Sequence, residues 1–573
     1  MPVQNTDIAE QLNRMADLLE IEGANPFRVR AYRNAARTVN GLARPVADLI
    51  RNKKDLTGFP GIGQDLADKI KQIVSKGTFT QLDEIQGRLP EELPRLMEID
   101  HLGPKRVKQL YQELGISAIK ELKAAARAKK IRTVKGFGKK IEQSVLNGLE
   151  QMASESNRIL LSEAEERAAP LLAHMHKAQD IDRITPAGSF RRRKETVGDL
   201  DLLICSDSPE KVIEHFTAYA DIKKIISRGE TLCRAVLLSG LHVDLRVLAP
   251  TDYAAGLHHF TGSKAHNIAL RKRAVKKNLK INEYGIFKGK KQISVSHEKQ
   301  IYEILDLAFV VPELREHTGE IKAAEQDRLP RLIQLQDIQG DLHVHTTETD
   351  GLADLEEMVQ TAQDMGYKYL AITDHSVQVR IANGMDTRRL EKQIEKIEAL
   401  NDRLENFRVL KGVEVDIRAN GSLDLPDDIL KKLDVRVCSI HFSHHLSRKK
   451  QTERIIKAME NPCFNILGHP TGRLINRRKP YAVDLEKVMA AAKENGCFLE
   501  LNAQPDRLDL NDEACRLARD MGVKIAVSSD AHDTGGLSYL RLGIDQARRG
   551  WLAPADVINT SDCHDLLQMM TRK

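Results

Sequence analysis

The chain has 573 residues, of which 41% are hydrophobic and 30% charged, with a formal net charge of +6. Because domains typically hold ~100–200 residues, this length excludes a single core and predicts three or four folded units. Seven cysteines without a CxxC pair argue against a disulfide-stabilised secreted protein. A polar N-terminus and the absence of any apolar run near the ~20 residues of a membrane span predict a cytoplasmic protein without a membrane partner.

Residues 1–150 are predicted to form short helices separated by glycine turns. FPGIG (59–63), HLGP (101–104) and KGFG (135–138) resemble helix–hairpin–helix turns, and in the middle copy Lys105 is expected to occupy the place of the second glycine. Glycine permits the tight turn, and the N–H groups of the following helix bind phosphate without identifying the base. We therefore expect DNA contacts at Gly61, Gly63, Gly103, Lys105, Gly136 and Gly138.

Basic residues are concentrated in two segments of the chain. Residues 101–150 contain 12 Lys/Arg and 4 Asp/Glu, and residues 264–291 contain 10 Lys/Arg and one acid, Glu283. Clustered positive charge is typical of proteins with a polyanionic partner. Solubilising surface charge is the alternative for one such segment alone. Because both segments flank motifs with catalytic residue types, we expect a nucleic acid.

Residues 151–317 are predicted to mix helices and strands that carry three carboxylates. In GSFRRRKETVGDLDLL (188–203), Asp199 and Asp201 lie two residues apart on a strand and therefore on one face. Asp244, in HVDLRV, lies on a second strand. Three such carboxylates repel one another unless cations lie between them, and two Mg²⁺ ions held in this way promote in-line phosphoryl transfer. Solvated aspartates at a polar strand end are the alternative.

The residues before this trio suit a triphosphate, because Gly188 and Ser189 offer N–H and hydroxyl groups and Arg192 offers a guanidinium fork. With HFTGSKAHN (259–267) and INEYGIF (281–287), these motifs resemble the palm and thumb of family X DNA polymerases. The resemblance implies an α+β nucleotidyltransferase palm that binds Mg²⁺ or Mn²⁺ at the three aspartates and uses deoxynucleoside triphosphates. It places Ser189, Arg192 and Gly198 at the phosphates, Gly262 at the sugar and base, and Asn267 and Arg271 at the nascent base pair and template.

The sequence departs from animal members of that family at three positions. His259 replaces a tyrosine before the TGS turn, which bears on ribose discrimination, and His242 replaces an arginine that bears on primer alignment. Lys69 matches the Schiff-base lysine of the family's deoxyribose-phosphate lyase domains. Asp65, which replaces a cation, and Asp68 flank it, and acidic neighbours raise a lysine pKa. We therefore favour a salt-bridging lysine over a lyase nucleophile.

From residue 341 onward, seven apolar segments alternate with helical patterns, which predicts a parallel sheet or an α/β barrel. Nearly every segment ends in His, Asp or Glu, and the C-terminal ends of barrel strands form the active face. Mixed imidazole and carboxylate ligands suit Zn²⁺ or Mn²⁺, which activate water and neutralise phosphate charge. Nine candidate ligands are enough for up to three ions: His343, His345, Asp350, His375, Glu414, His441, His469, Asp530 and His532.

The order of these motifs is similar to that of the polymerase and histidinol phosphatase (PHP) domain over residues 341–535. His441 is favoured by position over His444 and His445, whereas Glu500 matches no ligand position and is interpreted as a bystander. The resemblance implies a seven-stranded PHP-type barrel that acts as a 3′–5′ exonuclease, 3′-phosphatase or abasic-site endonuclease.

Both resemblances together predict a bacterial family X polymerase that fills gapped or nicked DNA in base excision repair, as a monomer. Its expected parts are an all-α helix–hairpin–helix region comprising a lyase-like domain (1–90) and fingers (91–150), then palm (151–250), thumb (251–317), linker (318–340) and PHP domain (341–573). Two alternatives stay open: a nucleotidyltransferase with a substrate other than DNA, and a DNA-binding scaffold with an inert barrel.

Overall fold

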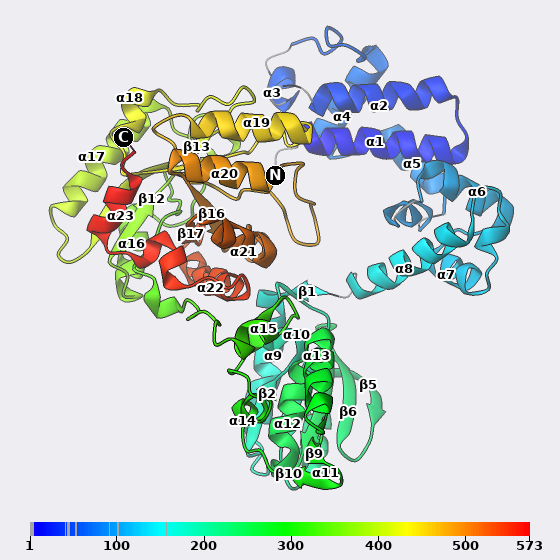
Figure 1. The fold of residues 1–573 in the computed structure, drawn as a ribbon. Coiled ribbons are helices and arrows are strands. Elements are labelled where there is room, and N and C mark those ends of the chain that lie inside the picture. Colours follow the sequence, from blue (N-terminus) through cyan, green and yellow to red (C-terminus); the bar gives the residue numbers. More distant parts are fainter. Residues whose placement is uncertain are drawn as a thin grey trace. The chain divides into compact units, whose positions relative to one another are not determined.

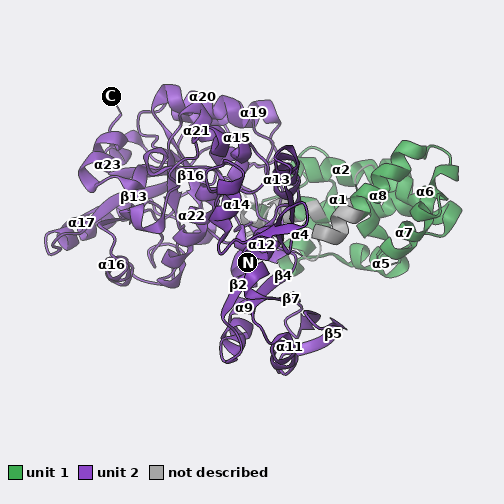
Figure 2. Ribbon diagram, turned by 60° about the horizontal axis from the view of Figure 1, so that its bottom comes forward, with its two compact units in different colours: residues 1–157 green, residues 158–573 purple. Residues whose placement is uncertain are grey.

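A computed structural model describes residues 5–40, 42, 46–51, 54–90, 92–99, 102–155 and 158–572 (Figure 1). The chain divides into two compact units, residues 1–157 and residues 158–573 (Figure 2). Within the described residues, no helix has both the length and the apolar character that crossing a membrane requires.

The regular structure of the first unit is helical throughout its described residues. Helix α1 (Asn5–Glu22) runs alongside α2 (Pro26–Asn40) (Figure 1), and Leu12 and Met15 on the apolar face of α1 are at most 1% exposed. The remaining elements are α3 (Val46–Arg51), α4 (Gln64–Lys76), α5 (Thr80–Arg88), η1 (Leu93–Glu98), α6 (Pro104–Leu114), α7 (Ile119–Arg127), η2 (Ile131–Thr133) and α8 (Lys139–Glu155).

The glycine repeat forms the same turn three times. In each copy a buried apolar residue donates its N–H to the carbonyl oxygen three residues earlier, and a glycine then precedes a helix: Ile62 to Phe59 at 3.1 Å, Leu102 to Ile99 at 3.0 Å, and Phe137 to Val134 at 3.0 Å. Gly103 therefore corresponds to Gly63 and Gly138. Our expectation that Lys105 replaces the second glycine is wrong, because the buried residue sets the register; the first glycine's place falls on His101, outside the described residues.

The second unit begins with the predicted palm, a five-stranded sheet of order β2-β4-β7-β6-β5. Strands β4 and β7 are parallel, and Leu200, Leu202, Val243 and Leu245 face the core. The elements are β1 (Ile159–Leu160), α9 (Leu161–Met175), β2 (Arg183–Pro186), α10 (Gly188–Arg191), β3 (Thr196–Val197), β4 (Leu200–Cys205), α11 (Pro209–Thr217), β5 (Ile222–Arg228), β6 (Leu232–Leu237) and β7 (His242–Leu248).

The predicted thumb follows as two long helices and a small antiparallel sheet of order β10-β9-β8. Its elements are α12 (Pro250–Thr261), α13 (Lys264–Lys276), β8 (Lys280–Asn282), β9 (Gly285–Lys288), β10 (Lys291–Ile293), α14 (Glu298–Ile304) and η3 (Pro312–Leu314). The segment that we expected to be a linker contains α15 (Glu320–Glu325) and η4 (Leu335–Asp337). Its Ala324 and Leu332 are buried in the thumb core, which also includes Trp551.

The last part is the predicted seven-stranded α/β barrel. All seven strands are parallel and pair in chain order, and a bridge between Val344 and Ala531 nearly closes the barrel. The strands are β11 (Gly340–Asp341), β12 (Tyr369–Ile372), β13 (Arg408–Asp416), β14 (Val435–Ser439), β15 (Ile466–Leu467), β16 (Phe498–Asn502) and β17 (Ile525–Ser528). The helices among them are α16 (Leu355–Asp364), α17 (Thr387–Asn401), α18 (Asp427–Leu430), α19 (Arg448–Met459), α20 (Leu485–Asn495), α21 (Asp512–Met521) and α22 (Leu540–Arg549).

The C-terminal helix α23 (Cys563–Met570) lies at the beginnings of the barrel strands. Asn465, directly before β15, donates to the carbonyl oxygen of Met570 at 2.8 Å. Leu566 and Met570 join an apolar cluster with Leu342 and Ala371. Because this end is filled by apolar side chains, the opposite end is the one at which polar ligands can gather.

Candidate functional site

The palm centre lies where β4 and β7 run side by side. Asp201 pairs directly with Asp244 in the parallel register, and Asp199 is exposed immediately before β4. Burial, followed by the negative charges of Asp199 and Asp244, raises the pKa of Asp201 to about 7. The structure thus brings the three predicted carboxylates together, and a divalent cation is the group that would relieve their repulsion.

Arg234 of β6 is a residue of this centre that the sequence analysis missed. It lies opposite Asp244 on the neighbouring strand, and its Nε donates to Asp244 Oδ2 at 2.9 Å. Among the described residues, the groups whose ligand atoms all lie within 4.8 Å of one another are in the barrel, so the palm trio is the looser set. A guanidinium therefore faces the third aspartate from β6, whereas His242 occupies the position two residues before it.

The loop between β2 and β4 packs closely against Asp201. Gly188 has a φ of +57°, and a Cβ there would overlap the Asp201 carboxylate, so glycine is required. Arg192 donates from Nη1 to the carbonyl oxygen of Thr261 at 2.6 Å. A Cβ on Gly262 would lie 3.2 Å from that same nitrogen. Gly188, Arg192 and Gly262 are therefore brought together beside Asp201.

The other predicted nucleotide contacts belong to the loop between β2 and β4 and to helix α13. Ser189 is in α10, and Gly198 separates β3 from β4. Asn267 of α13 donates to the carbonyl oxygen of His259 at 2.8 Å, and Arg271 Nη2 lies 3.1 Å from His259 Nδ1. Asn267 and Arg271 thus converge on His259, one of the positions at which this sequence departs from the animal enzymes.

The barrel centre gathers the nine predicted ligands where the strands end. His469 Nε2 lies 3.0 Å from Glu414 Oε1, which places it against the same carboxylate as His375 and His441. Three groups have ligand atoms within 4.8 Å of one another: His345, Asp350, His375 and His532; His343, His345 and Asp530; and His375, Glu414 and His441. Because these groups share members, the set suits a cluster of cations rather than isolated ions.

The electrostatics of the barrel centre also fit bound cations. Both ring nitrogens of His345 and Nδ1 of His469 are buried without a hydrogen bond of regular geometry, which is costly unless a partner is bound. Burial lowers the pKa of His345 to about 3, which leaves its ring neutral. Burial also disfavours the charged form of His375, but Glu414 and Asp350 outweigh it and raise that pKa to about 10. Divalent transition metals bind a neutral imidazole such as that of His345 directly, and they displace the proton from a charged one such as that of His375.

Carboxylates behind the ligands orient the imidazole rings. Glu500 Oε1 lies 2.7 Å from His343 Nδ1, and its Oε2 accepts a hydrogen bond from the main-chain N–H of His469 at 2.6 Å. Asp416 Oδ1 lies 3.2 Å from His441 Nδ1. Such contacts fix the tautomer and turn the other nitrogen toward a metal. Our interpretation of Glu500 as a bystander is therefore wrong; a buried acid on an apolar strand requires a partner, and that was the signal to follow.

Of the histidines that follow β14, His441 lies among the candidate ligands, at the position that the motif favours. His441 Nε2 lies 3.3 Å from Glu414 Oε1, inside the ligand set. His444 Nε2 instead lies 3.0 Å from the carbonyl oxygen of Ile440, and its ring stacks on Tyr481. The geometry therefore favours His441 as the ligand.

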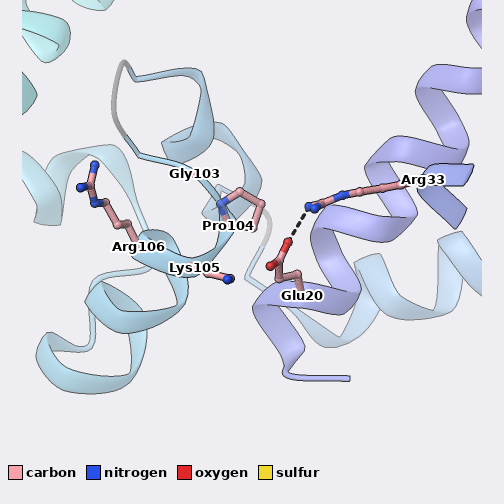
Figure 3. Close-up of a pocket in the computed structure, with 6 residues that line it drawn as sticks. All are labelled: Glu20, Arg33, Gly103, Pro104, Lys105 and Arg106. Carbon is pink, nitrogen blue, oxygen red and sulfur yellow. Dashed lines mark hydrogen bonds and ion pairs between the residues drawn. The ribbon is translucent and has the colours of Figure 1, made fainter. Parts of the chain in front are cut away.

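A basic groove in the first unit lies between the α1–α2 pair and α6. Its volume is about 670 Å³, and its lining includes Arg30, Arg33, Arg37, Lys105 and Lys108. Figure 3 shows Lys105 pointing toward Glu20 and Arg33, which form an ion pair at 2.5 Å, while Arg106 points away. Gly103 caps α6 without a side chain, and Pro104, the first residue of the helix, has no N–H group, so Lys105 carries the first main-chain N–H of α6. These features suit a phosphate backbone.

Lys69 makes the salt-bridging contacts that we expected. Its side chain is 12% exposed and forms an ion pair with Asp65 one helical turn earlier. Its ammonium lies 5.4 Å from the centre of the Tyr32 ring. The Lys69 ammonium is thus engaged by an ion pair and by a ring contact.

Comparisons with known proteins agree with this arrangement along the chain. Family models match as follows: a helix-hairpin-helix domain at residues 3–79, a SAM-like helix-hairpin-helix tandem at 93–151, the DNA polymerase beta thumb at 256–316 and the PHP domain at 341–504.

Curated relatives extend the likeness to whole proteins. The DNA polymerase/3′-5′ exonuclease PolX of Bacillus subtilis (strain 168) is 35% identical over 570 residues, covering 99% of both chains. A probable phosphatase of Thermoanaerobacter sp. (strain X514) is 36% identical over 231 residues, covering 38% of this chain and 89% of the relative. The chain belongs to the bacterial family X DNA polymerases that carry a C-terminal PHP domain.

Proposed function

We propose that this chain extends DNA 3′ ends in the palm and hydrolyses 3′-terminal phosphoesters in the barrel. The carrying observation is that one chain holds two separate centres, one of three carboxylates and one of nine imidazole and carboxylate ligands. Membership of the PolX family supports a DNA polymerase and 3′–5′ exonuclease with DNA and nucleotides as substrates.

In the palm, Asp199, Asp201 and Asp244 would hold two Mg²⁺ or Mn²⁺ ions. Such ions stabilise the attacking and leaving oxygens of an in-line phosphoryl transfer. The chain's own contribution is to place Arg192 beside that centre and to leave room for the nucleotide at Gly188 and Gly262, where added side chains would crowd Asp201 and Arg192. The loop therefore binds and orients the triphosphate.

In the barrel, the nine ligands would hold up to three Zn²⁺ or Mn²⁺ ions, which supply an activated water and neutralise phosphate charge. Glu500 and Asp416 hold the rings of His343 and His441 in place, and the apolar end below keeps the polar chemistry at the strand ends. The 3′-5′ exonuclease relative supports phosphodiester hydrolysis, and the probable phosphatase relative supports phosphomonoester hydrolysis, of which removal of a 3′-phosphate is one form. We extend the proposal to abasic-site cleavage, which is also the hydrolysis of a phosphodiester.

The DNA that suits this chain is gapped or nicked. The three glycine turns hold backbone without reading bases, and the groove beside α6 adds positive charge. Both centres are formed within a single chain, which supports a monomer. Each of the two alternatives leaves one feature unexplained. A DNA-binding scaffold with an inert barrel gives no role to the metal ligands gathered in the barrel. A nucleotidyltransferase with a substrate other than DNA gives no role to the three glycine turns.

The test is a reaction on a gapped duplex whose primer ends in a 3′-hydroxyl or a 3′-phosphate. With Mn²⁺ and nucleotides, we expect direct extension of the hydroxyl end and extension of the phosphate end only after its removal. DNA binding should weaken steeply as salt rises, because phosphate contacts release counterions. Failure to extend the 3′-hydroxyl primer would contradict the palm assignment, and a stable 3′-phosphate would contradict the phosphatase assignment.

A further inference from the structure

Within the second unit, the palm and thumb contact the barrel through a surface that neither candidate centre accounts for. Its apolar part joins Leu161, Ala164 and Val197 of the palm to Ile475, Leu508 and Leu542 of the barrel. Its polar part consists of ion pairs: Arg193 with Asp545 at 2.6 Å, Arg473 with Glu195 at 2.6 Å, Arg548 with Glu313 at 2.8 Å and Arg549 with Glu316 at 3.2 Å. The barrel is therefore packed against the loop that carries the predicted phosphate ligands.

Three consecutive arginines of that loop contact three different partners. Arg191 forms an ion pair with Glu298 of the thumb at 2.6 Å, and Arg193 forms one with Asp545 of barrel helix α22. Arg192 lies between them and donates from Nε to Glu316 at 2.9 Å. Arg192 is also the guanidinium that acts on Asp201 and lies beside Gly262.

Arg549, the last residue of α22, contacts the main chain of Arg192 directly and the side chain of Arg192 through Glu316. Its Nη1 donates to the main-chain carbonyl oxygen of Arg192 at 2.8 Å and to Glu316 Oε1 at 3.2 Å. Its Nη2 donates to Asp512 at 2.6 Å, and its side chain is only 3% exposed. The carboxylate oxygen that binds Arg549 is the one that accepts from Arg192 Nε. A barrel residue thus fixes both the backbone of Arg192 and the carboxylate that orients its guanidinium.

The carboxylate of Glu316 is negatively charged, so it attracts both Arg192 and Arg549. Burial alone would raise its pKa, but Arg192, Arg549 and Lys194 outweigh burial, so the pKa of Glu316 lies below its usual range. The carboxylate is therefore ionised and shared between two guanidiniums. Without Arg549, Glu316 would bind the Arg192 guanidinium more strongly and would compete with a triphosphate for it.

We propose that Arg549 is a positioning residue for nucleotide binding, so that the barrel completes the nucleotide site of the palm. By holding Glu316 and the backbone of Arg192, α22 presents the Arg192 guanidinium in the orientation that a triphosphate requires. The inference rests on the proposed function, because it assumes that Arg192 contacts the incoming nucleotide. It assigns to the barrel a role in polymerisation that is separate from its hydrolysis.

The test is single-nucleotide insertion into gapped DNA by the full-length protein with Arg549→Met. We expect the KM for the nucleotide to rise about tenfold, with a smaller change in kcat, because a binding contact shared by ground and transition states is weakened. Hydrolysis of a 3′-phosphate by the same preparation should stay at the parent rate. A nucleotide KM within about twofold of the parent would overturn the inference.

The matched control is Arg436→Met, because Arg436 is another buried barrel arginine, bound to the carbonyl oxygens of Leu433 and Cys463. It should leave the nucleotide KM unchanged; an equal rise in both variants would show a general loss of stability and overturn the inference. If Arg549→Met does not fold, Arg549→Lys decides the question. A lysine cannot bridge Glu316, Asp512 and the Arg192 carbonyl together, so a parental KM would again overturn the inference.

Two further variants separate this inference from the proposed function. Arg192→Ala should raise the nucleotide KM at least as much as Arg549→Met; without that rise, the assignment of Arg192 itself fails, and the inference fails with it. If Arg192→Ala raises the KM and Arg549→Met does not, only the inference fails. Arg549→Met combined with Glu316→Gln should be less than additive, because both act through one contact; full additivity would overturn the proposed route.

Discussion

The two candidate centres of this chain are built in opposite ways. The palm trio comes from two adjacent strands, with Asp199 exposed and Asp244 bound by Arg234. The barrel ligands come from six of the seven strands, all except β16, and most of them are buried. A centre of two neighbouring strands needs only local register, whereas the barrel centre exists only when the barrel closes.

This difference predicts which property a substitution at each centre affects first. In the palm, Asp199 is exposed, and Arg192 and Arg234 supply positive charge beside the three carboxylates. The buried barrel centre keeps its carboxylates ionised beside imidazoles, and the pKa of Glu414 lies well below its usual range because neighbouring histidines outweigh its burial. We therefore expect changes at the palm to affect catalysis first, and changes behind the barrel ligands to affect metal binding first.

The largest expected effect is from Asp201→Ala. Removing the central carboxylate should lower primer extension about a thousandfold or more, because cation binding at the palm is lost. Hydrolysis of a 3′-phosphate should continue at the parent rate, as should both activities in the exposed control Asp207→Ala. Both rates are measured on one gapped substrate, and a joint loss would contradict two independent centres.

The reverse change, His343→Ala, should abolish the barrel's activity while leaving extension intact. We expect hydrolysis to fall about a hundredfold or more and the bound Mn or Zn content to drop, since His343 belongs to one of the three ligand groups. His564→Ala, an exposed histidine of α23, is the control. Persisting hydrolysis with parental metal content would remove the barrel from the proposed chemistry.

A smaller effect is expected from Glu500→Gln, which keeps the shape of the side chain but removes its charge. Metal affinity should fall about 10–100-fold, because the imidazole of His343 loses the carboxylate that orients it. Titration with Mn²⁺ against a competing chelator measures this loss, and excess Mn²⁺ should restore hydrolysis. Glu486→Gln, on the exposed first turn of α20, should change nothing. Equal affinities in both variants would return Glu500 to the role of a bystander.

Stability should depend on pH at Asp201. The folded pKa of Asp201, about 7, lies well above the usual value of an aspartate, so the favourable contribution of its protonated form is present below pH ~4 and is lost as pH rises through 7. In chelator-treated protein at pH 8, Asp201→Asn should therefore increase the free energy of unfolding by at most about 4 kcal/mol and raise the midpoint temperature of unfolding. At pH 5 the gain should be much smaller. Thermal unfolding at both pH values measures the difference, and a gain independent of pH would contradict the charge argument.

The smallest expected effect is from Lys69→Ala. Extension should stay within about twofold of the parent, because Lys69 pairs with an exposed aspartate in the first unit, and such pairs contribute little. Borohydride treatment with an abasic-site substrate should trap no covalent adduct at Lys69. A trapped adduct that disappears in Lys69→Ala would show lyase activity and reverse our interpretation.

Several features of both centres were predictable because they depend on short sequence distances. Asp199 and Asp201 lie close together because side chains two residues apart in an extended segment point the same way, although Asp199 stands just before β4 and not on it. His343 and His345, whose rings lie 5.1 Å apart, likewise follow β11 instead of belonging to it. The barrel itself was predictable because each apolar segment alternates with a helix. The same kind of local reasoning failed at Lys105, where matching the first glycine instead of the buried residue shifted the repeat.

The sequence by itself determined the classes of element and the kinds of ligand in this protein. Only the tertiary structure decided which distant groups face them: Arg234 opposite Asp244, Glu500 behind His343, and Arg549 behind Arg192. Periodicity reports how side chains alternate along one element, whereas these pairs depend on strand register, barrel closure and domain packing. Glu500 and His343 are 157 positions apart, and Arg549 and Arg192 are 357 apart, so no local pattern specifies these contacts; Arg234 and Asp244 are near in sequence, but the register of β6 and β7 decides that they face each other.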